Sequence, residues 1–128
     1  MKVLILFSFL LASSFECFAQ QLEVRDFNYK PDKIVKGSSV LLSFSIYNGG
    51  KDLPANAFKM ECTINGNLVS LDDDTNSLLK NEKQRYSKQP GKFHWEVQNE
   101  KELVVEIILT PKVGYLEKTA FKRIIPVE

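Results

Sequence analysis

Apolar and polar residues alternate along several segments of this chain, and this pattern limits the available folds more than any other feature. The alternation is clearest in residues 40–47 (VLLSFSIY) and recurs in residues 58–64 and 103–109. A period of two places every second side chain on the same face of a β-strand. Residues 77–85 (SLLKNEKQR) are the best helical candidate, but the segment is too short to keep a helical period for three turns. The pattern therefore predicts an all-β protein.

Smaller features of these segments indicate where each strand lies in its sheet. In residues 103–109 the second face is also apolar, which predicts a central strand covered on both sides. Pro126 lies near the end of residues 119–127 and indicates an edge strand or a strand terminus, because proline cannot donate to the ladder. In residues 22–29 the alternation slips at Arg25-Asp26, as a β-bulge would cause.

Short turn sequences separate the alternating segments. Asn65-Gly66 supplies two residues that tolerate positive φ, which a two-residue hairpin needs, so residues 58–64 and 67–71 are expected to pair. Asn48-Gly49-Gly50 closes the segment that begins at Val40. About seven short strands separated by such turns predict a single immunoglobulin-like antiparallel β-sandwich over residues 20–128.

The N-terminal segment has the features of a secretory signal peptide. Lys2 gives a positive start, an apolar run extends to Ala12, and Cys17-Phe18-Ala19 suits cleavage before Gln20. The apolar run is too short to predict a membrane span. We therefore expect residues 1–19 to be removed and the remaining domain to be exported, either to the periplasm or as a secreted protein.

Charge and cysteine content narrow the possible classes of protein. The chain has a net charge of +1, so we expect no nucleic-acid partner. Without residues 1–19, Cys62 is the only cysteine, which excludes an internal disulfide. No Asn-x-Ser/Thr sequence occurs, and both absences favour a bacterial origin. Cys62 shares a strand face with Phe58 and Met60, so we expect a buried thiol.

Two parts of the chain resemble the bacterial CARDB-like group of immunoglobulin-like modules. The first runs from Leu22 to Asn67 and includes Val35-Lys36-Gly37 and the strand that ends in Asn48-Gly49-Gly50. The second is the closing strand, Thr119 to Val127. The middle departs from the group, because residues 72–101 are longer than its pattern. The resemblance implies a non-enzymatic β-sandwich and assigns no residue roles.

The sequence predicts no catalytic residue, no cofactor and no structural metal site. His94 is the single histidine, so neither a zinc site nor a general base beside a nucleophile elbow is indicated. Residues 72–76 (DDDTN) begin like a calcium loop, but Ser77 stands where glycine is needed and Lys83 where the bidentate glutamate belongs. We predict a solvated loop there, with a weak calcium site as the alternative.

The segment after these acids is the most distinctive part of the chain. Between residues 80 and 92, five cations are opposed by one acid, Glu82. Basic and aromatic residues together are typical of binding hot spots, and long loops in small domains are often functional. The alternative is a solvated loop with Phe93 and Trp95 partly in the core. We predict a partner-binding site formed by Lys80, Lys83, Arg85, Tyr86, Lys88, Lys92 and Trp95.

These observations predict a small exported, non-enzymatic protein that binds a protein partner in trans. A periplasmic inhibitor or immunity protein is a specific form of this hypothesis, by analogy with other small exported domains. The alternative is a structural or chaperone-like subunit of a surface or secretion assembly, which adds a strand to a partner. An exposed edge strand would also allow homo-oligomers.

Overall fold

The computed structural model describes residues 20–87 and 93–128, so predictions about residues 1–19, Lys88 and Lys92 lie outside the described residues. Eight strands and no helix occur in this part of the chain. The strands are β1 (Glu23–Lys30), β2 (Ser39–Tyr47), β3 (Phe58–Ile64), β4 (Asn67–Asp72), β5 (Lys83–Tyr86), β6 (His94–Glu96), β7 (Glu102–Pro111) and β8 (Thr119–Pro126).

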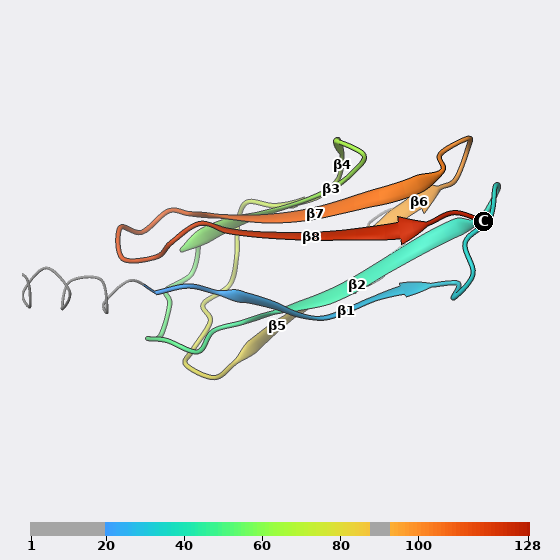
Figure 1. Cartoon of the computed structure of the whole chain (residues 1–128). Coiled ribbons are helices and arrows are strands. Elements are labelled where there is room, and N and C mark those ends of the chain that lie inside the picture. Colours follow the sequence, from blue (N-terminus) through green and yellow to red (C-terminus); the bar gives the residue numbers. More distant parts are fainter. Residues whose placement is uncertain (1–19, 88–92) are drawn as a thin grey trace, which may run out of the picture.

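The strands form two antiparallel sheets that face each other as the two layers of a sandwich (Figure 1). One sheet has the order β4-β3-β7-β8. The other has the order β1-β2-β5, and β6 also pairs with β2. β5 pairs with the C-terminal half of β2, from Phe44 to Tyr47, and β6 pairs with its first residues, from Ser39 to Leu41. The predicted immunoglobulin-like β-sandwich is therefore confirmed.

The core lies between the inner faces of the two sheets. Every second residue of the central strands is at most 1% exposed, as the period-two pattern predicts. Phe44 on β2 lies at the middle of an aromatic group, with its ring 5.3 Å from that of Tyr86 and 5.6 Å from that of Phe93. Such stacked and edge-to-face aromatic pairs add to the stabilisation that burial alone provides. These buried central positions are Val40, Leu42, Phe44, Ile46, Met60, Cys62, Ile64, Leu103, Val105, Ile107 and Leu109.

Four local predictions are confirmed. β3 and β4 pair as a hairpin, and both turn residues, Asn65 and Gly66, have positive φ. The register of β1 against β2 shifts after Arg25, where Asp26 adopts a φ of 56°. β8 is an edge strand, and Cys62 is buried in the core.

The best helical candidate forms no helix, in keeping with the all-β prediction, and one local prediction, the covering of β7 on both sides, is wrong. Residues 77–85 do not form a helix, because Leu78 pairs with Leu53 and the segment then enters β5. Unpaired backbone groups along β2 need partners, and this tertiary requirement outweighs the local helical preference. β7 is central but covered on only one side, since the protein has two layers and Val104 and Ile108 on its outer face remain half-exposed.

One buried side chain holds the end of β2 in place. The Asn48 side chain donates from Nδ2 to the backbone oxygens of Lys51 (2.7 Å) and Leu78 (2.9 Å). Its Oδ1 accepts from the Gly50 N–H (3.0 Å) and from Nε2 of Gln20 (2.8 Å). Asn48 is 0% exposed, so every one of these hydrogen bonds replaces one to water that burial removes.

Replacing Phe44 with alanine should lower the free energy of unfolding by about 3–5 kcal/mol, because it leaves a cavity in the aromatic group. Urea unfolding followed by circular dichroism measures this loss. Leu68→Ala is the matched control: Leu68 is 56% exposed, so its loss should change the stability by less than about 0.5 kcal/mol. A small effect of Phe44→Ala would contradict the described core.

Candidate functional site

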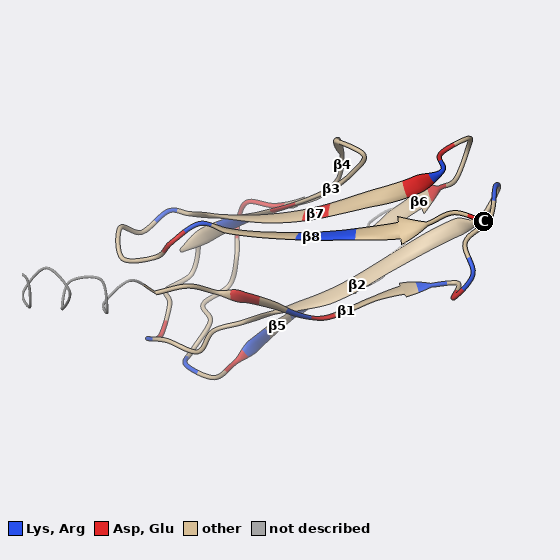
Figure 2. Cartoon of the chain, in the orientation of Figure 1, with Lys and Arg blue, Asp and Glu red and all other residues tan. Residues whose placement is uncertain are grey.

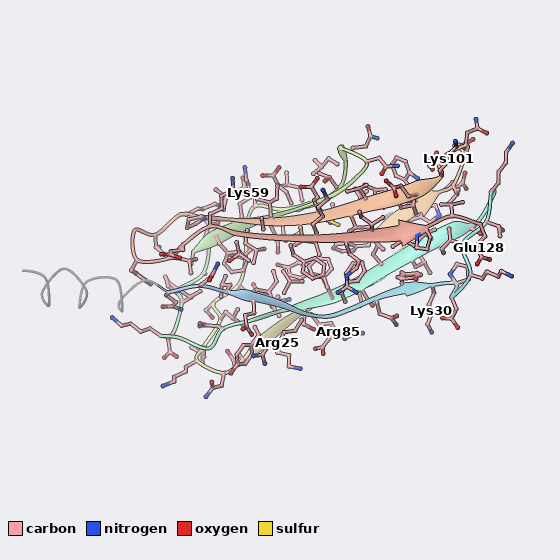
Figure 3. The ribbon with its side chains drawn as sticks, viewed as in Figure 1. Arg25, Lys30, Lys59, Arg85, Lys101 and Glu128 are labelled. Carbon is pink, nitrogen blue, oxygen red and sulfur yellow. The ribbon has the colours of Figure 1, made fainter. Side chains whose placement is uncertain are left out.

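The register of β1, β2 and β5 gathers basic side chains on the outer face of their sheet. Arg25 and Arg85 both lie opposite Ser45, one from each neighbouring strand, and Lys83 lies opposite Tyr47. Lys30 lies further along the same face of β1. We call Arg25, Lys30, Lys83 and Arg85 the cationic face. Figure 2 shows the basic segments on β1 and β5, and in Figure 3 the labelled Arg25, Lys30 and Arg85 lie on the opposite side of the sandwich from Lys59.

Two of these cations are held by neighbouring groups. The Arg25 guanidinium stacks on the Tyr47 ring at 3.6 Å from its centroid and forms a salt bridge with Glu23 at 2.6 Å. Lys83 donates to Asp26 in the β1 bulge at 3.0 Å, across β2. Hydrogen bonding and charge from Lys83 lower the pKa of Asp26, and Arg85 adds to this effect. The bulge therefore turns Asp26 toward β5, and its ion pair with Lys83 orders this part of the cationic face.

Beside these pairs the face contains a hollow of about 170 Å³. Lys30 and Arg85 line it from opposite sides, Asn28, Ser43 and Ser87 add polar groups, and Leu41 is also part of its lining. Neither Lys30 nor Arg85 forms a salt bridge with any of the described residues. Two cations with hydroxyl and amide groups between them are suited to bind a carboxylate or another small anion.

The structure brings together only part of the predicted partner-binding set. Lys83 and Arg85 lie on the cationic face, whereas Lys80 is an exposed residue of the turn before β5. Tyr86 points inward, is 8% exposed and donates to Asp72 at 2.6 Å; burial and this carboxylate raise its pKa. Trp95 is half-buried against the core and donates to Glu100 at 3.0 Å. The aromatic members of the set therefore face the core, Tyr86 within it and Trp95 packed against it.

Two residues of the cationic face were absent from the predicted set, because they come from β1. Arg25 and Lys30 are distant in sequence from residues 80–92, and only the pairing of both strands with β2 brings them near Arg85. The sequence did contain one usable signal. The slip of alternation at Arg25-Asp26 indicated a bulge, and bulges often redirect side chains at functional sites.

The other candidate groups have structural partners. Within residues 72–76, Asp72 accepts from the Asp74 N–H at 3.3 Å, and Asp73 forms a salt bridge with Lys112 at 2.8 Å that lowers the Asp73 pKa. In the described part of the chain, no three His, Cys, Asp or Glu side chains gather closely enough to hold a metal ion. His94 is exposed at the surface and shares a hydrogen bond with Ser39.

Burial controls the chemistry of Cys62. The side chain is 0% exposed, and desolvation raises the pKa of its thiol from 9.0 to about 12. A thiol in such surroundings stays protonated and unreactive at neutral pH.

No helix among residues 20–87 and 93–128 is long and apolar enough to cross a membrane.

Comparison with known proteins identifies the fold. No protein-family model and no curated protein matches the chain. The crystal structure of the CARDB domain of the PF1109 protein from Pyrococcus furiosus, in complex with di-metal ions, matches with a TM-score of 0.66 at 19% identity over 86% of this chain and 90% of that one. The solution structure of the same domain matches with a TM-score of 0.58 at 19% identity, over 85% and 95% of the two chains.

A third match extends the likeness to a larger protein. The sporulation control protein Spo0M from Bacillus subtilis matches with a TM-score of 0.53 at 13% identity over 84% of this chain. The aligned part is 49% of Spo0M, so this chain spans about half of that protein's length. The protein thus has the immunoglobulin-like fold of CARDB domains, as the resemblance in residues 22–67 and 119–127 implied.

Replacing Lys83 with methionine should raise the pKa of Asp26 toward its ordinary value of 3.8, because the hydrogen bond from Lys83 is the main cause of its depression. A carboxyl titration followed by NMR measures this shift. A lowered pKa stabilises the fold above the unfolded-state pKa, and this contribution is lost as the pH falls through the folded-state pKa. The variant should therefore lose less stability in acid than the wild type.

Lys80→Met is the control for this titration, because it removes the lysine three residues before Lys83, which has no part in the Asp26 pKa shift. The Asp26 pKa should be the same in this variant and in the wild type. An unchanged pKa in Lys83→Met would contradict the ion pair across β2.

The Cys62 thiol should react with iodoacetamide only when the protein unfolds, because it is buried and its pKa is raised. Mass spectrometry of folded and urea-treated protein at pH about 8 measures the labelling. The Cys62 thiol ionises more easily in the unfolded protein than in the folded one. The free energy of unfolding should therefore fall as the pH rises from 9.0 to about 12. Rapid labelling of the folded protein would show that the core opens readily.

Proposed function

We propose that this protein is a small exported, non-enzymatic binding protein that uses its cationic face to bind an acidic segment of a protein partner in trans. The partner's carboxylates would pair with Arg85 and Lys30 around the hollow, and its backbone would lie across the outer face of β2. An inhibitor or immunity protein of an exported toxin or lytic enzyme fits this description.

One observation supports the proposal most directly. Lys30 and Arg85 come from strands on opposite sides of β2, line the same hollow and form no salt bridge within residues 20–87 and 93–128. The net charge of the chain is only +1. Two neighbouring cations without a salt bridge on a near-neutral protein favour anion binding at that position over a general attraction to anions.

The proposal places no metal ion in the interface. The CARDB domain of PF1109 was crystallised with di-metal ions, but its likeness to this chain is at 19% identity and concerns the fold. Residues 72–76 use two of their carboxylates on internal partners, namely Tyr86 and Lys112. The basic side chains of the cationic face point to an anionic protein surface as the ligand.

Affinity capture with the double variant Lys83→Glu/Arg85→Glu tests this function. The wild-type domain is immobilised and incubated with a cell-envelope extract, and the bound proteins are identified by mass spectrometry. Charge reversal on the face should reduce recovery of the specific partner at least about tenfold, since like charges across an interface are repulsive. Recovery from the wild type should also fall as salt increases, because exposed ion pairs are screened.

The double variant Lys118→Glu/Lys122→Glu is the matched control. It changes the net charge by the same amount, and both lysines are exposed at or before β8, in the opposite sheet. It should retain the partner. Equal recovery by both variants would exclude the cationic face as the site. Recovery of only further copies of this chain would instead support the structural-subunit hypothesis and contradict binding to a different protein.

A further inference from the structure

Gln20 is the first described residue, and its backbone and side chain are both held by the fold. Its backbone N–H donates to the Tyr115 oxygen at 3.1 Å, and its own carbonyl accepts from the Glu117 N–H at 2.7 Å. Its side-chain Nε2 donates to Oδ1 of Asn48 at 2.8 Å and to the backbone oxygen of Lys51 at 3.0 Å. The residue is 8% exposed, so Gln20 is packed into the protein.

Gly50 forms the floor of the slot that holds this side chain. A Cβ atom added to Gly50 would lie 2.6 Å from Cδ and 2.7 Å from Cγ of Gln20, which is closer than any real contact. The φ of Gly50 lies outside the left-handed region, so a larger residue is excluded by the Gln20 side chain and not by backbone strain. We call Asn48, Gly50 and Lys51 the glutamine slot.

Cleavage between Ala19 and Gln20, which the sequence predicts, makes Gln20 the N-terminal residue. A free N-terminal glutamine can cyclise without any co-reactant. The lone pair of the α-nitrogen attacks Cδ, the Cδ–Nε2 bond breaks, and a proton moves from the α-nitrogen to Nε2, which leaves as ammonia. The product is a neutral lactam whose new amide bond is about 1.33 Å long. Cδ must therefore reach the α-nitrogen of its own residue.

We propose that the glutamine slot keeps the mature N-terminal Gln20 in its open form, so that the exported protein retains a charged α-amine. This inference rests on the predicted cleavage site and is independent of the proposed partner. Cyclisation would remove both hydrogen bonds of Nε2 and move Cδ away from Gly50. The α-nitrogen is meanwhile bonded to Tyr115, in a bridge between Gln20 and Leu116 that opposes fraying of the new terminus.

The direct test uses residues 20–128 with Gln20 at the N-terminus, released from a fusion by a protease that cuts immediately before it. Intact-mass spectrometry follows the loss of one ammonia over time, in buffer and in denaturing urea. We expect cyclisation to be at least about tenfold slower in the folded protein, because it requires the slot to open. Equal rates in the two conditions would overturn the proposal.

Two glycine variants locate the protection in the slot. Gly50→Ala should displace the Gln20 side chain and raise the rate in buffer toward the rate in urea. Gly49→Ala is the matched control, because its Cβ would meet the Tyr47 ring at 3.1 Å and no atom of Gln20. It should cyclise at the wild-type rate. Slow cyclisation in a folded Gly50→Ala protein would contradict the role of the slot. If Gly50→Ala does not fold, the comparison of the wild type in buffer and in urea decides the proposal.

The exported protein tests the premise separately. The full chain is produced in a bacterium and the protein is recovered from the periplasm. Its intact mass is then measured by mass spectrometry. The expected mass is that of residues 20–128 with glutamine unchanged at the N-terminus. A mass lower by one ammonia would show that the slot does not protect Gln20, and an N-terminus at any other residue would overturn the inference at its first step.

Discussion

The buried amide of Asn48 is the interaction on which the arrangement of the β1-β2-β5 sheet depends. At the end of β2 it bonds to the turn that follows, to the backbone of Leu78 and to Gln20. Its backbone N–H donates to Glu82 at 3.0 Å, and its carbonyl accepts from Asn81 at 2.6 Å. Because a buried amide without these partners would be costly, the approach to β5 is tied to the end of β2.

This anchor fixes the register of β5, and the register has two consequences at once. With Lys83 opposite Tyr47, the alternation of β5 turns Lys83 and Arg85 outward and Tyr86 into the aromatic core. A slip by one residue would bury both cations and expose the tyrosine. The packing of Tyr86 in the core and the position of the cationic face are therefore two results of the same pairing, and a change of register would remove both together.

The features that depend on local sequence could be predicted, and those that depend on tertiary pairing could not. Alternation in β2, β3 and β7 predicted the buried faces, and Asn65-Gly66 predicted the β3–β4 hairpin. Residues 77–85, the best helical candidate, form no helix because the free edge of β2 pairs with the end of that segment as β5. Tyr86 and Trp95 were grouped with the basic residues by their proximity in sequence, although strand alternation places their side chains on the inner face.

Charge compensation explains why we propose the hollow, and not the whole cationic face, as the binding position. Glu23 neutralises Arg25 and Asp26 neutralises Lys83, so these pairs order the sheet surface but offer little free charge. Lys30 and Arg85 have no such acidic partner in the described residues, and they line the hollow together. An arriving carboxylate gains hydrogen bonds from these two side chains without breaking an existing salt bridge, whereas at Arg25 or Lys83 it must displace one. In the proposed complex, binding energy would therefore be concentrated at the hollow, because there the attraction is not offset by the loss of an internal pair.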